Sequence, residues 1–106
     1  PQVLPVNDIE LATVFANAIE NAIHACEKIE EKKRYINIKI ISHPRFMLQI
    51  ENSFNGEAEF NEDGIPISHE DGHGFGTRSI AAFCDKNNAF YEFKSNENKF
   101  TLTIMF

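Results

Sequence analysis

Two kinds of hydrophobic periodicity follow one another along this chain, and their order restricts the folds open to it. Residues 35–42 (YINIKIIS) and 46–52 (FMLQIEN) alternate apolar with polar side chains, as half-buried strands do, and His43-Pro44 separates them. Residues 8–33 carry a helical period instead, formed by Val14, Phe15, Ala18, Ile19, Ala22, Ile23 and Cys26. The first half therefore predicts one long helix followed by a β-hairpin.

The second half repeats this order of elements after an irregular stretch. Residues 53–72 are rich in Asn, Glu, Asp and Gly and show no period, and connections of that length are usually functional lids or disordered. Residues 76–86 then predict a second helix, and 89–95 and 99–106 predict a second strand pair that turns at residues 96–98. The whole pattern predicts an α+β fold, a two-layer sandwich with both helices on one face of a sheet.

Length and composition suit one small domain. The chain has 106 residues, of which 42% are hydrophobic, and its net charge is −6. That charge disfavours general nucleic-acid binding, although backbone amides and a metal ion can still create a local phosphate site. Cys26 and Cys84 lie in apolar helical contexts and are expected to be buried reduced thiols. Because the sequence begins without Met and ends within an apolar alternation, we expect residues 1–106 to be a domain excised from a longer protein.

Four polar residues share one side of the first predicted helix. Asn17, Glu20, Asn21 and His24 stand at i, i+3, i+4 and i+7. An ordinary solvent-facing stripe is one interpretation, but Asn costs about half a kcal/mol relative to Ala in a helix. The alternative is a binding site, because an amide oxygen is a ligand that suits Mg²⁺ and an amide nitrogen can donate to a phosphate oxygen.

Glycine is concentrated before the second predicted helix. Three of the five glycines, Gly72, Gly74 and Gly76, alternate in the segment GHGFG. The glycines alone are compatible with a hinge, a tight turn or a phosphate-binding loop. The last possibility follows from the free backbone amides of a helix N-terminus, which glycine allows a phosphate to approach closely.

Taken together, the two segments resemble the motifs of the GHKL superfamily of ATP-binding domains. NAIENA at residues 17–22 is similar to the N box of sensor histidine kinases, usually N-L-L-D-N-A. HGFGTRSI at residues 73–80 is similar to the H-G-I-G-L-x-N-I glycine box of the Gram-positive peptide-quorum-sensing histidine kinases. The resemblance covers nearly the whole chain, and it implies the Bergerat (GHKL) fold with a mixed sheet and ATP held between the first helix and the lid.

The resemblance also implies roles for individual residues. Asn21 matches the position that coordinates Mg²⁺, and Asn17 matches the position that is a water-activating glutamate in the ATP-hydrolysing members. An amide cannot take a proton from water, so Asn17 favours phosphoryl transfer over hydrolysis. We therefore expect Asn17 and Asn21 to be catalytic, Asn21 to bind the metal, and His24 to face the phosphates. The glycine box is expected to bind the phosphates through Gly72, His73, Gly74, Phe75 and Gly76.

The proximal glycine box, D-x-G-x-G in the family, departs from the usual pattern. Asn52 stands at the position of the Asp that bonds the adenine amino group, and one glycine is retained at Gly56. An Asn oxygen can accept the same hydrogen bond but carries no charge. We therefore expect Asn52 to bind adenine more weakly or less selectively. Thr77 replaces the Leu that usually follows the glycines.

The function implied by the resemblance is that of the catalytic, Mg-ATP-binding domain of a two-component sensor histidine kinase. Such a domain presents the γ-phosphate to a histidine on a separate dimerisation domain of the parent chain, from which a response regulator receives it. The parent protein would be a membrane-anchored homodimer with this domain in the cytoplasm. An anti-sigma-factor-like serine kinase and a degenerate domain acting as a signalling interaction module are the alternatives. A transition-metal site is disfavoured because its candidate ligands have no cysteine partner; they are Asp63, His69, Glu70, Asp71 and His73.

Overall fold

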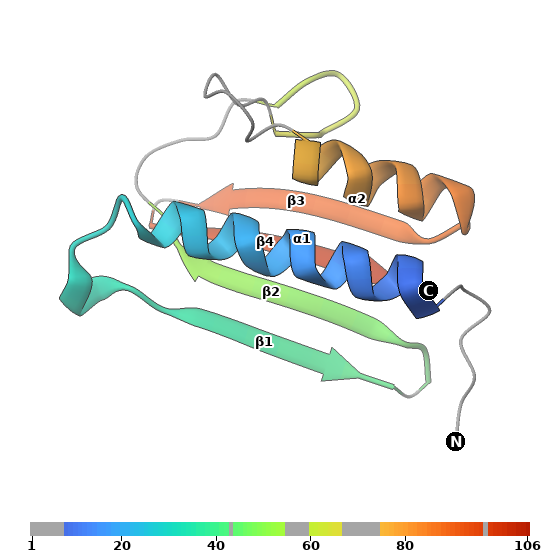
Figure 1. The fold of residues 1–106 in the computed structure, drawn as a ribbon, viewed down its shortest axis with the longest axis horizontal. Coiled ribbons are helices and arrows are strands. Elements are labelled where there is room, and N and C mark those ends of the chain that lie inside the picture. Colours follow the sequence, from blue (N-terminus) through green and yellow to red (C-terminus); the bar gives the residue numbers. More distant parts are fainter. Residues whose placement is uncertain (1–7, 43, 55–59, 67–74, 97) are drawn as a thin grey trace.

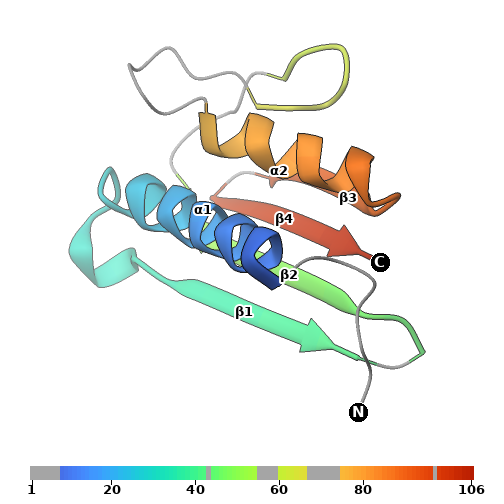
Figure 2. The ribbon, with the colours of Figure 1, turned by 45° about the vertical axis from the view of Figure 1, so that its right-hand side comes forward.

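Two helices lie on one face of a four-stranded sheet (Figures 1 and 2). The computed structural model describes residues 8–42, 44–54, 60–66, 75–96 and 98–106. Its elements are α1 (Asp8–Cys26), a 3₁₀ turn η1 (Glu31–Lys33), β1 (Ile36–Ile41), β2 (Met47–Ser53), α2 (Phe75–Lys86), β3 (Phe90–Asn96) and β4 (Lys99–Met105). The predicted α+β sandwich is confirmed.

The sheet is antiparallel throughout the described residues, so the expectation of a mixed sheet is corrected. Its strand order is β1-β2-β4-β3, and each of the three neighbouring pairs is antiparallel. The crossover through α2 makes β2 and β3 run in the same direction, but β4 returns from β3 and inserts between them. Strands that run in the same direction, β2 with β3 and β1 with β4, are therefore never neighbours.

Cross-strand rows of apolar side chains form the floor of the core. Strand register places Ile38, Ile50, Leu102 and Phe93 in one row across all four strands, and Ile40, Leu48, Ile104 and Tyr91 in the next. The middle members of both rows are buried beneath the helices, whereas Ile38 and Ile40 on edge strand β1 are 46% and 54% exposed. The helices complete the core with Val14, Ala18, Ala22, Ile80, Phe83 and Cys84. Both cysteines are buried and free, as predicted.

The first helix is shorter than the predicted span of residues 8–33. Cys26 is its last residue and its last buried position, and none of residues 27–34 is buried. The Arg34 side chain closes the turn that follows, because its Nε donates to the Ile29 carbonyl at 2.8 Å and its Nη2 donates to the Glu27 carbonyl at 3.4 Å. Without an apolar face to bury, the polar segment turns back towards β1 instead of extending the helix.

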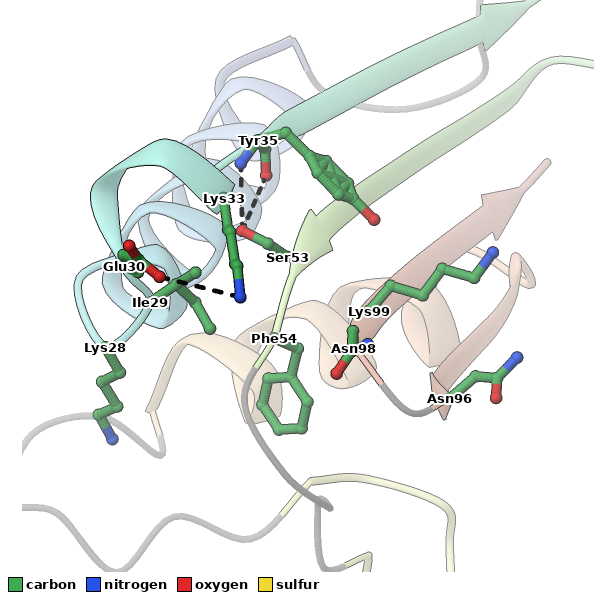
Figure 3. Close-up of a pocket in the computed structure, with 10 residues that line it drawn as sticks. All are labelled: Lys28, Ile29, Glu30, Lys33, Tyr35, Ser53, Phe54, Asn96, Asn98 and Lys99. Atoms are coloured by element: carbon green, nitrogen blue, oxygen red, sulfur yellow. Dashed lines mark hydrogen bonds and ion pairs between the residues drawn. The ribbon is translucent and has the colours of Figure 1, made fainter.

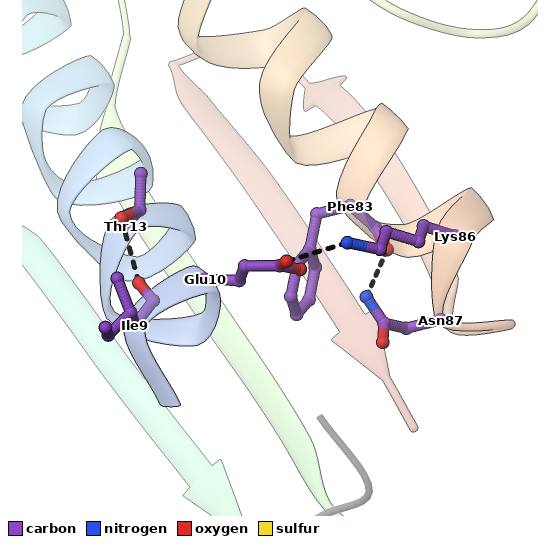
Figure 4. A network of polar contacts seen from close by, with 6 residues as sticks. All are labelled: Ile9, Glu10, Thr13, Phe83, Lys86 and Asn87. Carbon is purple, nitrogen blue, oxygen red and sulfur yellow. Dashed lines mark hydrogen bonds and ion pairs between the residues drawn. The ribbon is translucent and has the colours of Figure 1, made fainter. Parts of the chain in front are cut away.

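The two helices run antiparallel and are joined by a salt bridge near one end (Figure 4). Lys86 Nζ at the end of α2 lies 2.7 Å from Glu10 Oε1 in the first turn of α1. Helix α2 then ends in a Schellman motif, in which Asn88 has a φ of 56° and the Ala89 amide donates to the Cys84 carbonyl at 2.8 Å.

Candidate functional site

The polar stripe on α1 lies on the side of the helix that faces α2. Glu10 marks that side, because its carboxylate pairs with Lys86 of α2. Asn17 follows Glu10 by seven residues and Asn21 by eleven, and both spacings return to nearly the same side of an α-helix. The structure therefore brings Asn17 and Asn21 to the boundary between the two helices.

The same salt bridge also fixes the level of these residues along the helix pair. Asn21 lies eleven residues beyond Glu10 on α1, and Phe75 lies eleven residues before Lys86 on the antiparallel α2. Each interval corresponds to an axial rise of about 16 Å. Asn21 is therefore roughly level with the N-terminus of α2, where the first backbone N–H groups have no partner within the helix.

The asparagine side chains are partly exposed and available to a ligand. Asn17 and Asn21 are both of intermediate burial, and neither side chain is hydrogen-bonded to another residue in the described ranges. Two neutral amide oxygens beside a helix N-terminus match the chemistry of a hydrated Mg²⁺ ion bridged to phosphate. The residues present here therefore fit the metal and nucleotide that the resemblance implies.

His24 contacts a residue just beyond the end of its own helix. Its Nδ1 lies 3.0 Å from Glu27 Oε1, and the two side chains are 35% and 64% exposed. The imidazole shares the stripe of Asn17 and Asn21 but contacts a carboxylate. Its predicted role towards the phosphates stays a prediction.

Part of the predicted glycine box falls outside the described residues. Gly72, His73 and Gly74 lie there, as do most members of the disfavoured transition-metal set. Phe75 and Gly76 are the first residues of α2, which places the end of the box at a helix N-terminus, and Thr77 next to them is buried at 8% exposure. A helix N-terminus is the feature that a phosphate-binding loop requires.

Asn52 is buried near the end of β2, on the helix-facing side of the sheet. Its cross-strand partners are Ile36 on β1 and Phe100 on β4, and its side chain is 3% exposed. Its Nδ2 donates a hydrogen bond to the Ser53 carbonyl at 2.8 Å. Asn52 thus lies on the same side of the sheet as the apolar rows, and its amide is held in a fixed orientation.

A polar cluster around Ser53 is a feature that the sequence motifs did not indicate. Ser53 Oγ accepts from the Tyr35 amide at 3.1 Å and lies 3.3 Å from Cys26 Sγ. The thiol also donates to the Tyr35 carbonyl at 3.4 Å, and desolvation followed by the charge of Glu51 raises the pKa of the Tyr35 phenol. The cluster ties the end of α1 to β1 and β2. The feature of the sequence that could have indicated this cluster is the position of Ser53 directly after the motif residue Asn52.

A cavity of about 610 Å³ opens at the same end of the sheet (Figure 3). Its lining comes from the turn after α1, the end of β2 and the β3–β4 connection: Lys28, Ile29, Glu30, Lys33, Tyr35, Ser53, Phe54, Asn96, Asn98 and Lys99. None of the predicted site residues lines it. The lining contains three lysines and one glutamate, so it is cationic, whereas the net charge of the chain is −6. One of these lysines is paired, since Lys33 Nζ lies 3.8 Å from Glu30 Oε2. The cavity thus adjoins Asn52 through Ser53 without containing it.

Within the described ranges, no three His, Cys, Asp or Glu residues are grouped so that they could hold a metal ion. Thr101 and Thr103 alternate with buried Leu102 and Ile104, so they lie on the sheet face away from the helices, where Thr103 Oγ1 accepts from Gln49 Nε2 at 3.2 Å. Among the described helices, none combines the length and hydrophobicity needed to cross a bilayer.

Comparison with known proteins identifies the family. A family model described as GHKL domain matches residues 6–106, and the chain therefore belongs to the GHKL family of ATP-binding domains. GHKL domains bind ATP, generally with Mg²⁺, and the family includes both kinases and ATPases. No curated protein matches the chain.

Proposed function

We propose that this chain is the Mg-ATP-binding catalytic domain of a two-component sensor histidine kinase, of the kind found in the peptide-quorum-sensing branch. The observation that carries the proposal is the pair Asn17 and Asn21 on the side of α1 that faces α2. Asn17 has no group that could deprotonate water, which favours a kinase over an ATPase within the family.

The chain's own residues would act by positioning the nucleotide. Asn21 would hold the metal through its amide oxygen, Asn17 would contact the phosphate region, and the N-terminus of α2 would bind phosphate through backbone amides. When bound, Mg²⁺ neutralises charge on the phosphates. The acceptor would be a histidine on a separate dimerisation domain, so catalysis here depends on orientation and electrostatics rather than on a covalent intermediate.

The remaining parts of the proposal concern the parent protein. We propose that residues 1–106 form one domain of a homodimeric, membrane-anchored sensor whose kinase domain is cytoplasmic and whose phosphoryl group passes to a response regulator. The motif form HGFGTRSI supports this assignment through its similarity to the quorum-sensing kinases.

Calorimetric titration of the domain with ADP and a non-hydrolysable ATP analogue, with and without Mg²⁺, tests the nucleotide site. We expect both ligands to bind and Mg²⁺ to strengthen the binding. A folded domain that shows neither heat nor thermal stabilisation at millimolar nucleotide would refute the proposal and favour an interaction module.

The type of kinase is tested by phosphotransfer from labelled ATP after the dimerisation domain is supplied. Phosphohistidine is lost in acid and survives base, whereas phosphoserine survives acid. An acid-stable product would therefore favour the serine-kinase alternative.

Gly74→Val should weaken ATP-analogue binding while adenosine binding persists, because the added side chain would obstruct only the phosphates.

A further inference from the structure

The outer edge of β1 has no strand beside it among the described residues (Figure 1). Edge strands are usually protected from other chains by proline, by a bulge or by an inward-pointing charge. β1 (INIKII) contains no proline, and its register with β2 is uninterrupted from Ile36 to Ile41. Its one charged residue, Lys39, lies on the face of the sheet away from the helices. The edge of β1 is therefore open to pairing with a further strand.

Alternate residues of β1 direct their backbone groups towards this open edge. The Tyr35 carbonyl accepts from the Ser53 amide at 3.0 Å, and this pair continues the register of β1 with β2. In an antiparallel ladder, the N–H and C=O groups of every second residue point to the same neighbouring strand. The odd-numbered residues of β1 therefore face β2, so Ile36, Ile38 and Ile40 present their backbone groups to the open edge.

The side chains of the same isoleucines lie on the helix-facing side of the sheet, where the edge strand is incompletely covered. Ile38 and Ile40 are 46% and 54% exposed, whereas their cross-strand partners Ile50 and Leu48 on β2 are each 2% exposed. The difference arises because α1 packs mainly against β2 and α2. A strand added at this edge would pair the backbone groups of β1 and cover part of its isoleucine side chains.

The order of residues on β1 is complementary to itself. When a second copy pairs antiparallel with the two Ile38 residues opposite each other, Ile36 lies opposite the partner's Ile40, and Asn37 lies opposite the partner's Lys39. Apolar side chains then meet on the helix-facing side, and each outward-pointing backbone meets another. The other register of equal length places Lys39 opposite the partner's Lys39, and like charges directly opposite each other destabilise a strand pair. Charge therefore favours the register centred on Ile38.

We infer that the edge of β1 is an interface between two copies of this chain, paired antiparallel about Ile38. The twofold axis of such a pair is perpendicular to the sheet, so the two sheets become continuous and the helices of both copies lie on the same face. The boundary between α1 and α2 lies on the far side of α1 from this interface, so the pairing is independent of the proposed nucleotide site. Because the contact is small, association of the free chains is expected to be weak.

Sedimentation equilibrium over a range of concentrations measures the association. Ile38→Lys places two like charges opposite each other at an exposed position and should weaken dimer formation about tenfold. Phe90→Lys is the matched control, because Phe90 is 54% exposed on the opposite edge strand β3, and it should leave association unchanged. Circular dichroism verifies that both variants fold. A chain that stays monomeric up to about 1 mM, or equal effects of the two variants, would overturn the inference.

Cysteine cross-linking tests the register. Ile38→Cys places two thiols opposite each other, with Cα atoms about 5.5 Å apart, which a disulfide can span. Ile40→Cys is similarly exposed but lies opposite the partner's Ile36, so its two thiols are well separated along the strands. Since Cys26 and Cys84 are buried, mild oxidation should yield a covalent dimer with Ile38→Cys alone. Equal yields from the two variants, or none from Ile38→Cys, would contradict pairing about Ile38.

Discussion

Replacement of Asn21 by Ala separates function from stability at the centre of the proposed site. Asn21 is partly exposed in the middle of α1, and its side chain has no hydrogen-bond partner among the described residues. No interaction seen in these ranges is lost in Asn21→Ala, and Ala is the better helix former by about half a kcal/mol. The variant should therefore be slightly more stable than the unmodified domain and should lose Mg²⁺-dependent nucleotide binding.

The size of the stability change can be estimated in advance. For a domain of about this length, 1 kcal/mol shifts the melting temperature by about 4–8 °C, so Asn21→Ala should raise it by about 2–4 °C. Thermal unfolding followed by circular dichroism measures that shift. Calorimetry with ADP, with and without Mg²⁺, then measures the metal dependence on the same sample.

Two control variants make the comparison specific. Asn37→Ala removes an exposed asparagine on β1, away from the stripe, and should leave Mg²⁺-dependent binding intact. Asn87→Ala removes a structural asparagine, whose Nδ2 donates to the Phe83 carbonyl at 2.9 Å, and should cost about 1 kcal/mol. If Asn21→Ala lowers stability as Asn87→Ala does, Asn21 is structural and its assignment as the metal ligand is wrong.

Three further predictions concern the core, the helix pair and the pH dependence. Ile80→Ala should destabilise the domain by about 2–5 kcal/mol in chemical denaturation, because Ile80 is fully buried; a cost below 1 kcal/mol would mean that the core is not packed as described. Lys86→Gln should cost at most about 0.5 kcal/mol and less in high salt, since Lys86 and Glu10 are 67% and 38% exposed; a larger, salt-insensitive loss would contradict a solvent-screened pair. Burial, with a smaller effect of Asp85, raises the pKa of the Cys84 thiol from 9.0 to about 11, so the unfolded chain ionises first and stability should fall as pH rises from about 9 to about 11. Denaturation across that range should show a weaker decline in Cys84→Ala, and an equal decline would assign it to other groups.

The sequence predicted the elements of the fold better than their ends or their pairing. Alternation located all four strands to within one or two residues, since half-buried strands need that pattern. The helical period was extended too far, because a polar segment such as residues 27–33 can equally be a solvated helix or a turn. The insertion of β4 between β2 and β3 depends on tertiary packing, which no local pattern records.

The candidate site was predictable only in part, for a similar reason. Residue spacing placed Asn17 and Asn21 on one side of a helix, but the salt bridge between Glu10 and Lys86 was needed to show that this side faces α2. Those partners are 76 residues apart in the sequence. The cationic cavity beside Ser53 is also formed by three separate segments and follows from no single motif.

Asn52 shows how far motif matching can reach at such a site. The resemblance matches Asn52 to the adenine-binding position of the family, and that role stays a prediction. The structure adds the orientation of its amide, because Nδ2 donates to the Ser53 carbonyl at 2.8 Å. Ser53 Oγ in turn accepts from the Tyr35 amide at 3.1 Å and lies 3.3 Å from the Sγ of Cys26, a residue 27 positions away in the sequence. A motif can therefore locate a candidate residue, while the orientation of its side chain depends on contacts between segments that the motif does not record.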